Sequence, residues 1–158
     1  FKANRLNMEF WLLQAAYFFL WTLLMYIMLI LAHNVPFLMY YHSDHHFQVA
    51  TNNVGTWKWT NLILYIDTWE TTVDQWLTEV IPTFIFSLVT GAWWIFISYY
   101  IWSATFQEMV EHNPRVDIYP FEVSGKWHLV HHEYPGKNYG IIHPLWDMVF
   151  GTAKKHSI

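Results

Sequence analysis

The stretch VIPTFIFSLVTGAWWIFISYYIWSATFQ (residues 80–107) decides how this chain folds, because it runs for 28 residues without a charge. About 20 residues of helix cross a hydrocarbon core, so the stretch could form one long crossing. It could also form a hairpin, because Gly91 lies near its middle and glycine is the commonest helix terminator. The first arm would cover roughly residues 69–89 and the second roughly residues 92–110, with Pro82 expected to kink the first arm.

Two histidine-rich stretches flank this segment and distinguish the two alternatives. Residues 42–46 (HSDHH) precede it, and residues 128–132 (HLVHH) follow it. A single crossing would leave the two stretches on opposite sides of the membrane, where they could not share a site. A hairpin returns the chain to the side that it left. We therefore favour the hairpin, with both stretches facing one compartment.

A second uncharged run covers residues 10–41, and its residues 10–32 are long enough for one membrane helix. The run is longer than the apolar core of a signal peptide and ends without a small-residue cleavage site. The whole chain is 54% hydrophobic and only 13% charged, against about 25% charged in soluble domains. We predict an all-α, multi-pass integral membrane protein with about three membrane helices, namely one span plus a helical hairpin. A His-rich helical cap lies on one side, and residues 47–68 and 113–126 form loops.

Composition also limits the partners and cofactors. A net charge of -4 with scattered Lys and Arg offers no basic patch, so we expect no nucleic-acid partner. Without a cysteine the chain cannot form a disulfide, a thiolate zinc site or an iron–sulfur cluster. No Gly-x-Gly-x-x-Gly motif is present, so no organic cofactor is predicted. A metal would have to be bound by His, Asp or Glu.

Six histidines form two copies of His-x-x-His-His, which is far from an even spread. Positions i, i+3 and i+4 of a helix share one face, so each copy presents three imidazoles together. Neutral imidazole suits iron, zinc and copper, and six imidazoles can surround two cations without repelling one another. The alternative, in which interfacial histidines bind lipid headgroups, requires no fixed triplet and is less favoured. The two triplets are His42, His45 and His46, and His128, His131 and His132.

Further polar residues stand near these triplets. His33 lies at the exit of the first span and His112 follows the hairpin, and we predict both as metal ligands. His143 could be a ligand or an ordinary interfacial histidine. Glu111 and Asp147 are candidates to orient ligand imidazoles, because a ligating histidine usually donates its other N–H to a carboxylate or carbonyl.

From about Thr22 onward the chain resembles the fatty acid hydroxylase/sterol desaturase superfamily of integral-membrane di-metal oxygenases. That superfamily is marked by His-x-x-x-His at the end of a span, then His-x-x-His-His, a helical hairpin, a last His-x-x-His-His and a closing signature. The signature is present here as NYGIIHPLWDMVFGT (residues 138–152). The departure is in the first element. His33 has the expected spacing to His42, but Leu29 stands where the preceding histidine belongs, and Thr22 and Ile30 stand where Asp and Arg are common.

The resemblance implies a membrane-bound, O2-dependent oxidoreductase that hydroxylates or desaturates an acyl chain, sterol or carotenoid. It implies two iron ions, with zinc as the alternative metal, and an external electron donor such as cytochrome b5 or a ferredoxin. Residues 1–158 would form a single hydroxylase-like domain, short for the superfamily, whose members usually carry more helices upstream. The membrane could be the endoplasmic reticulum, the mitochondrial inner membrane or a bacterial inner membrane.

Leu29 keeps an alternative open, because leucine cannot coordinate a metal. The chain could be a catalytically impaired relative that serves as a structural subunit of a larger membrane complex. A zinc hydrolase is much less favoured, because no His-Glu-x-x-His motif occurs. Metal content would distinguish an oxygenase from a metal-free structural subunit.

Overall fold

The computed structural model describes residues 2–52, 56–119, 121 and 123–155. In this part of the chain the regular structure is helical, and one isolated bridge joins Asp117 to Gly125. The prediction of an all-α protein is confirmed. The α-helices are α1 (Lys2–Asn34), α2 (Pro36–Asn52), α3 (Trp69–Gln75), α4 (Ile81–Thr90), α5 (Trp93–Trp102), α6 (Glu108–Val110), α7 (Lys126–Glu133) and α8 (Leu145–Phe150). Shorter turns are the 3-10 helix Trp59–Ile63 and the π-helical turns Trp76–Val80 and Ser103–Gln107.

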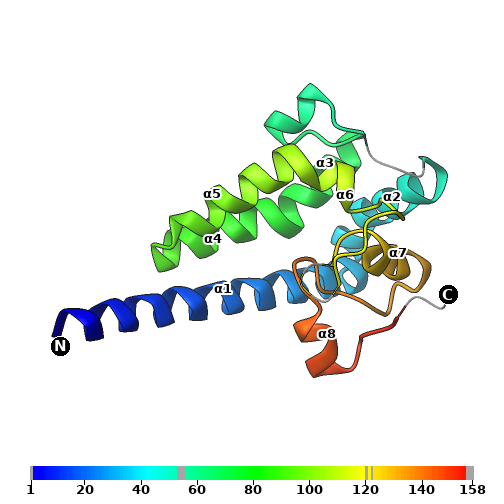
Figure 1. The fold of residues 1–158 in the computed structure, drawn as a ribbon. Helices are drawn as coiled ribbons and strands as arrows, with labels where there is room; N and C mark the ends of the chain where they lie inside the picture. Colours follow the sequence, from blue (N-terminus) through cyan, green and yellow to red (C-terminus); the bar gives the residue numbers. More distant parts are fainter. Residues whose placement is uncertain (1, 53–55, 120, 122, 156–158) are drawn as a thin grey trace.

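Helix α1 is the long axis of the molecule (Figure 1). Its segment Asn7–Asn34 is the one helix among the described residues that is both long and apolar enough to cross a membrane. This agrees with the span predicted over residues 10–32. The N-terminal end of α1 lies far from the cap formed by α2, α7 and α8 (Figure 1).

The predicted helical hairpin is present. The α3–α4 segment and the α5–α6 segment run side by side along α1 (Figure 1). Gly91 adopts a left-handed conformation (φ 73°), and its N–H donates to the Ser87 carbonyl at 2.9 Å, which ends α4. Pro82 lies in the first turn of α4, directly after the π-helical turn Trp76–Val80. How many times the hairpin crosses the bilayer stays a prediction.

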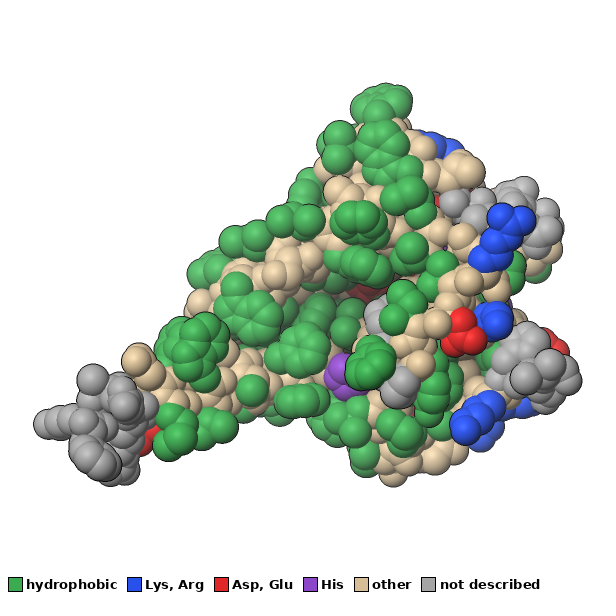
Figure 2. Space-filling view, in the orientation of Figure 1, with side chains coloured by type: hydrophobic (Ala, Val, Ile, Leu, Met, Phe, Trp, Pro, Cys, Tyr) green, Lys and Arg blue, Asp and Glu red, His purple; other side chains and the backbone are tan. Residues whose placement is uncertain are grey.

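The buried core lies between α1 and the hairpin. Trp21 and Met25 of α1 pack with Ile95 and Tyr99 of α5. The Trp21 indole N–H also donates to the Thr83 hydroxyl at 2.9 Å, which satisfies a polar group inside this apolar contact. Many large apolar side chains of α1, α4 and α5 face outward instead, whereas the Lys and Arg side chains visible in Figure 2 lie toward the cap end. An apolar exterior is what a lipid environment requires.

One loop prediction is partly wrong. Residues 47–52 continue α2 rather than starting a loop. The segment contains neither glycine nor proline, so nothing in it stops the helix before Asn52. Residues 113–125, in contrast, contain no helix among the described residues, in agreement with the prediction.

Candidate metal centre

The junction of α1 and α2 brings the histidines of these two helices together. Helix α1 ends at Asn34 and α2 begins at Pro36, whose ring removes a backbone donor and bends the chain. The backbone bonds from Val35 N to Leu31 O (2.8 Å) and from Met39 N to Val35 O (2.9 Å) keep the bend tight. As a result, His33 at the end of α1 lies beside the histidines of α2.

Helix α7 supplies the second part of the site, and Gly125 fixes where it starts. Gly125 has φ 73°, and its N–H donates to the Glu111 carbonyl at 2.8 Å. A Cβ on Gly125 would collide with the Val116 carbonyl oxygen and lie 2.8 Å from that of Asn113. Only glycine fits here, and the close contact holds α7 against the end of the hairpin.

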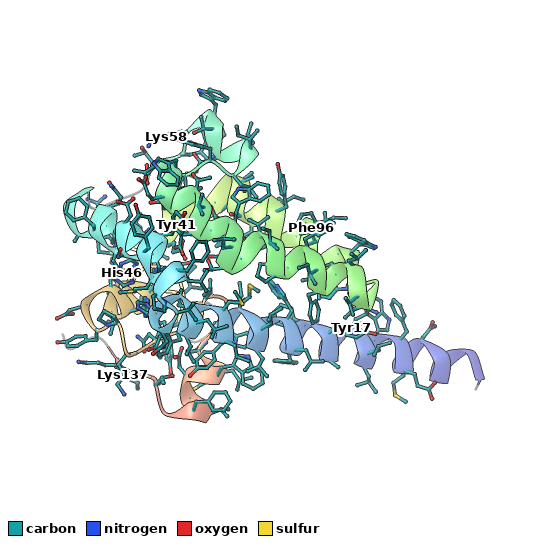
Figure 3. All side chains as sticks on the ribbon, turned by 180° about the vertical axis from the view of Figure 1, so that it is seen from behind. Tyr17, Tyr41, His46, Lys58, Phe96 and Lys137 are labelled. Atoms are coloured by element: carbon teal, nitrogen blue, oxygen red, sulfur yellow. The ribbon has the colours of Figure 1, made fainter. Side chains whose placement is uncertain are left out.

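Eight histidines form two clusters, each with four ligand atoms within 4.8 Å of one another. Figure 3 labels His46 in this region, at the cap end of the molecule. Cluster one contains His33, His42, His46 and His131, and cluster two contains His45, His112, His128 and His132. The clusters adjoin, since the ring centroids of His46 and His132 are 4.2 Å apart. The structure thus brings together all eight residues predicted as ligands.

Each His-x-x-His-His motif contributes to both clusters. The residues at i and i+4 enter the same cluster, which holds for His42 and His46 and for His128 and His132. The residue at i+3 enters the other cluster. A helix turns about 100° per residue, so i and i+4 point about 40° apart, while i+3 and i+4 point about 100° apart. The motif spacing therefore suits two adjacent metals, whereas the sequence predicted each triplet only as a unit.

In cluster one the Nε2 atoms converge. The Nε2 of His33 is 2.9 Å from that of His131 and 3.0 Å from that of His42. The Nε2 of His46 is 3.1 Å from that of His42. Two outer partners show that lone pairs face this centre. His131 Nδ1 lies 2.7 Å from the Lys137 carbonyl, which can only accept, and His42 Nδ1 lies 2.9 Å from an Asp74 carboxylate oxygen.

Because these Nδ1 atoms are the donors, the rings of His42 and His131 direct their Nε2 atoms at the same point. Converging lone pairs repel one another unless a cation lies between them. The donor chemistry of cluster one therefore fits a divalent transition metal.

Cluster two is built in the same way. The Nε2 atoms of His128 and His132 are 3.0 Å apart. The His112 ring centroid lies 4.9 Å from both the His45 and the His132 ring centroids. One buried ring nitrogen of this cluster, His112 Nε2, has no hydrogen-bond partner in the described structure. A buried polar atom without a partner is costly, and a bound metal would remove that cost for a nitrogen that ligates it.

Burial lowers the pKa of imidazoles in both clusters. Desolvation lowers the pKa of His45 to about 4 and that of His131 to about 3. Desolvation, with added repulsion from neighbouring histidines, lowers the pKa of His112 and His128 well below the usual value. At neutral pH the lone pairs are therefore available to a metal rather than occupied by protons.

The two predicted orienting carboxylates take different positions. Asp147 is fully buried, and its carboxylate accepts from Tyr139 N (2.7 Å), Gly140 N (2.8 Å) and the Thr152 hydroxyl (2.7 Å). It thus holds the loop that begins at Lys137, and it acts on His131 only through that loop. Its predicted role as a direct partner of an imidazole is wrong. Glu111 does approach His128, at 3.8 Å.

His143 is separate from both clusters. Its ring centroid lies 6.0 Å from those of Phe18 and Phe19, in apolar surroundings. Its Nδ1 accepts from Leu145 N at 3.3 Å. His143 therefore lies outside both clusters, with its Nε2 buried and without a hydrogen-bond partner among the described residues. Its role stays a prediction.

Asp74 is the residue that sequence reasoning missed. It lies on the first arm of the hairpin, 32 residues from His42. The available signal was the position of a carboxylate at the cap end of an apolar helix, where burial requires a partner.

Leu29 closes one side of a small polar cavity. The cavity has a volume of about 30 Å³, room for a water molecule. It touches both clusters and four carboxylates of the hairpin. The side chains that matter here are Leu29, His42, His45, His128, Asp74, Glu79, Glu108 and Glu111. Leu29 is only 4% exposed, one helical turn before His33. The position expected to hold a ligand thus faces the metal centre but supplies no donor.

A family model described as fatty acid hydroxylase matches residues 14–152. The chain belongs to the fatty acid hydroxylase family. The match covers all eight clustered histidines and the closing signature around Asp147. Family membership indicates a lipid-modifying oxidoreductase associated with membranes. Searches among curated proteins and among solved structures found no match.

Proposed function

We propose that this fatty acid hydroxylase family member is an integral-membrane, O2-dependent di-iron oxidoreductase that hydroxylates or desaturates a lipid. The observation that carries the proposal is the pair of adjacent four-histidine clusters at the cap end of the apolar helix α1. Neutral nitrogen donors suit iron as well as zinc.

The metal explains how such a reaction could occur. Bound iron would supply the reduction of O2 and an oxidant for an unactivated C–H bond, which amino-acid side chains cannot provide. The chain's own residues bind and orient. Asp74 and the Lys137 carbonyl hold the outer nitrogens of His42 and His131, so their lone pairs point into cluster one.

The substrate class follows from the surroundings of the centre. The exposed sides of α1, α4 and α5 are apolar, and Figure 2 shows such side chains on both sides of the hollow between α1 and the hairpin. We expect a hydrocarbon substrate to reach the clusters from the bilayer through this hollow. An acyl chain, a sterol and a carotenoid all have the required apolar character.

Electrons would come from another protein, because the chain has no flavin-, haem- or nicotinamide-binding motif. A cytochrome b5-like or ferredoxin-like donor fits this need. We expect it to approach the cap, because both histidine clusters lie there. The basic residues that follow the hairpin favour the cytosolic or matrix side for this cap.

The test is metal content followed by turnover. The purified chain in lipid nanodiscs is expected to contain two irons, and O2 with a reducing system is expected to add oxygen to a lipid or remove two hydrogens from it. Mass spectrometry of the extracted lipid is the measurement. His46→Ala is the test variant. Ser43→Ala is its matched control, because Ser43 lies on the same helix and its side chain is exposed. A folded preparation that never takes up metal would support the structural-subunit alternative and overturn the proposal.

A further inference from the structure

Glu111 approaches cluster two differently from the way Asp74 approaches cluster one. Asp74 lies beside Nδ1 of His42, the outer nitrogen, while Nε2 of the same ring points to His33. The Glu111 Oε1 atom lies 3.8 Å from Nε2 of His128. That nitrogen faces inward, since it is 3.0 Å from Nε2 of His132. Glu111 is therefore on the metal-facing side of the imidazole.

The 3.8 Å between Glu111 Oε1 and His128 Nε2 is a distance that two ligands of the same metal can have. Nitrogen and oxygen donors bind a divalent transition metal at about 2.0–2.2 Å, which places neighbouring donors about 3–4 Å apart. The Glu111 side chain is buried, and it lines the same cavity as His45 and His128 of cluster two. Its other oxygen, Oε2, accepts from the Gln107 amide at 3.0 Å, so that Oε1 is the oxygen on the side of His128.

The charge of a divalent metal ion gives a second reason to expect a carboxylate at cluster two. Four neutral imidazoles leave the full charge of a divalent ion uncompensated, and a buried uncompensated charge is costly. Cluster one has the Asp74 carboxylate 2.9 Å from one of its rings. In the described structure, Glu111 is the carboxylate that comes within 4 Å of a ring nitrogen of cluster two.

We propose that Glu111 is an anionic ligand of the metal in cluster two, in addition to the four histidines. The inference rests on the proposed di-metal centre. It assigns to this glutamate a direct bond to the metal rather than the orienting role expected from the sequence. It also makes the two metals unequal, with four imidazoles at one and four imidazoles plus a carboxylate at the other.

Cobalt(II) binding to the metal-free full chain in detergent tests the proposal, because the visible absorption of cobalt reports its coordination number. The unaltered chain is expected to bind two cobalt ions. Glu111→Gln keeps the size of the side chain and an oxygen for Gln107, and it should weaken one of the two sites at least tenfold and change its absorption bands. Glu133→Gln is the control, because Glu133 also neighbours a clustered histidine in sequence but is exposed.

The outcomes separate this inference from the proposed function. Failure of the unaltered chain to bind cobalt would overturn both. Two bound ions, with Glu111→Gln matching the unaltered chain in affinity and spectrum, would overturn only the assignment of Glu111. If Glu111→Gln does not fold, Glu111→Asp keeps the charge but shortens the reach by one methylene, and the same weakening is expected. An unchanged isotherm and spectrum for Glu111→Asp would then overturn the assignment.

Discussion

Asp74 Oδ2 lies 2.9 Å from Nδ1 of His42, and both side chains are buried. The contact joins the first arm of the hairpin to α2, so the apolar part of the molecule orients a histidine of the cap. A carboxylate at this nitrogen fixes the ring orientation and makes the inner nitrogen a better donor. The hairpin therefore contributes a residue to the candidate metal centre and does not only anchor the chain.

Replacing Asp74 by Asn is expected to weaken metal binding at cluster one by about 10–100-fold, because the outer partner of His42 loses its charge. Isothermal titration of the metal-free chain measures the change. Glu70→Gln, one turn earlier on α3, is the control and should bind as the unaltered chain does. Equal affinity in Asp74→Asn would show that the contact does not tune the ligand.

Leu29→His is expected to tighten metal binding about tenfold, or about 1.4 kcal/mol, because it adds a nitrogen donor beside the clusters. Leu29 lines the cavity that His42 also lines, so an imidazole there has a donor near cluster one. Leu29→Asn is the control, because it makes position 29 polar without adding an imidazole, and it should not tighten metal binding. No change in Leu29→His would place position 29 outside the reach of the metal.

Two glycines with the same φ of 73° allow a matched comparison. Gly91→Ala has open space for its Cβ and should cost about 1 kcal/mol of unfolding free energy from the left-handed conformation alone. Gly125→Ala adds a collision with backbone carbonyl oxygens and should cost at least about 2 kcal/mol more and lose metal from both clusters. Denaturant unfolding in detergent and metal analysis measure these effects. Similar losses in both variants would contradict the role of Gly125 in placing α7.

Asp147→Asn is expected to destabilise the chain by about 1–3 kcal/mol, because one of the buried donors that now meet the carboxylate would face an amide N–H2 instead. The Lys137 carbonyl should shift with the loop and weaken metal binding at His131 as a second effect. Asp117→Asn, at an exposed position, is the control. A variant with normal stability but weak metal binding would mean that Asp147 contacts the centre directly.

The sequence was sufficient for the elements that depend on local pattern. The hairpin follows from an uncharged stretch interrupted by Gly91. Six of the eight clustered histidines follow from the two repeated motifs, whereas His33 and His112 were predicted from their places at the exit of the first span and after the hairpin. These features depend on helical periodicity and on the side of the membrane to which the chain returns. That the clustered histidines bind metal stays a prediction.

What could not be predicted depends on contacts between distant segments. The division of each triplet between two clusters is set by how α2 and α7 are oriented against each other. The choice of His42 as the partner of Asp74 and the indirect action of Asp147 through Lys137 cannot be read from local sequence, because the packing of distant segments determines them. Polar partners of this kind are determined by the tertiary fold.

Cluster one takes one histidine from the proposed membrane span and three from the cap, on either side of the bend at Pro36. Its integrity therefore depends on how the bilayer positions α1, and a lipid mixture of unsuitable thickness would pull His33 away from its partners. Detergent choice and acyl-chain length should consequently be varied before a low metal content is attributed to the polypeptide itself.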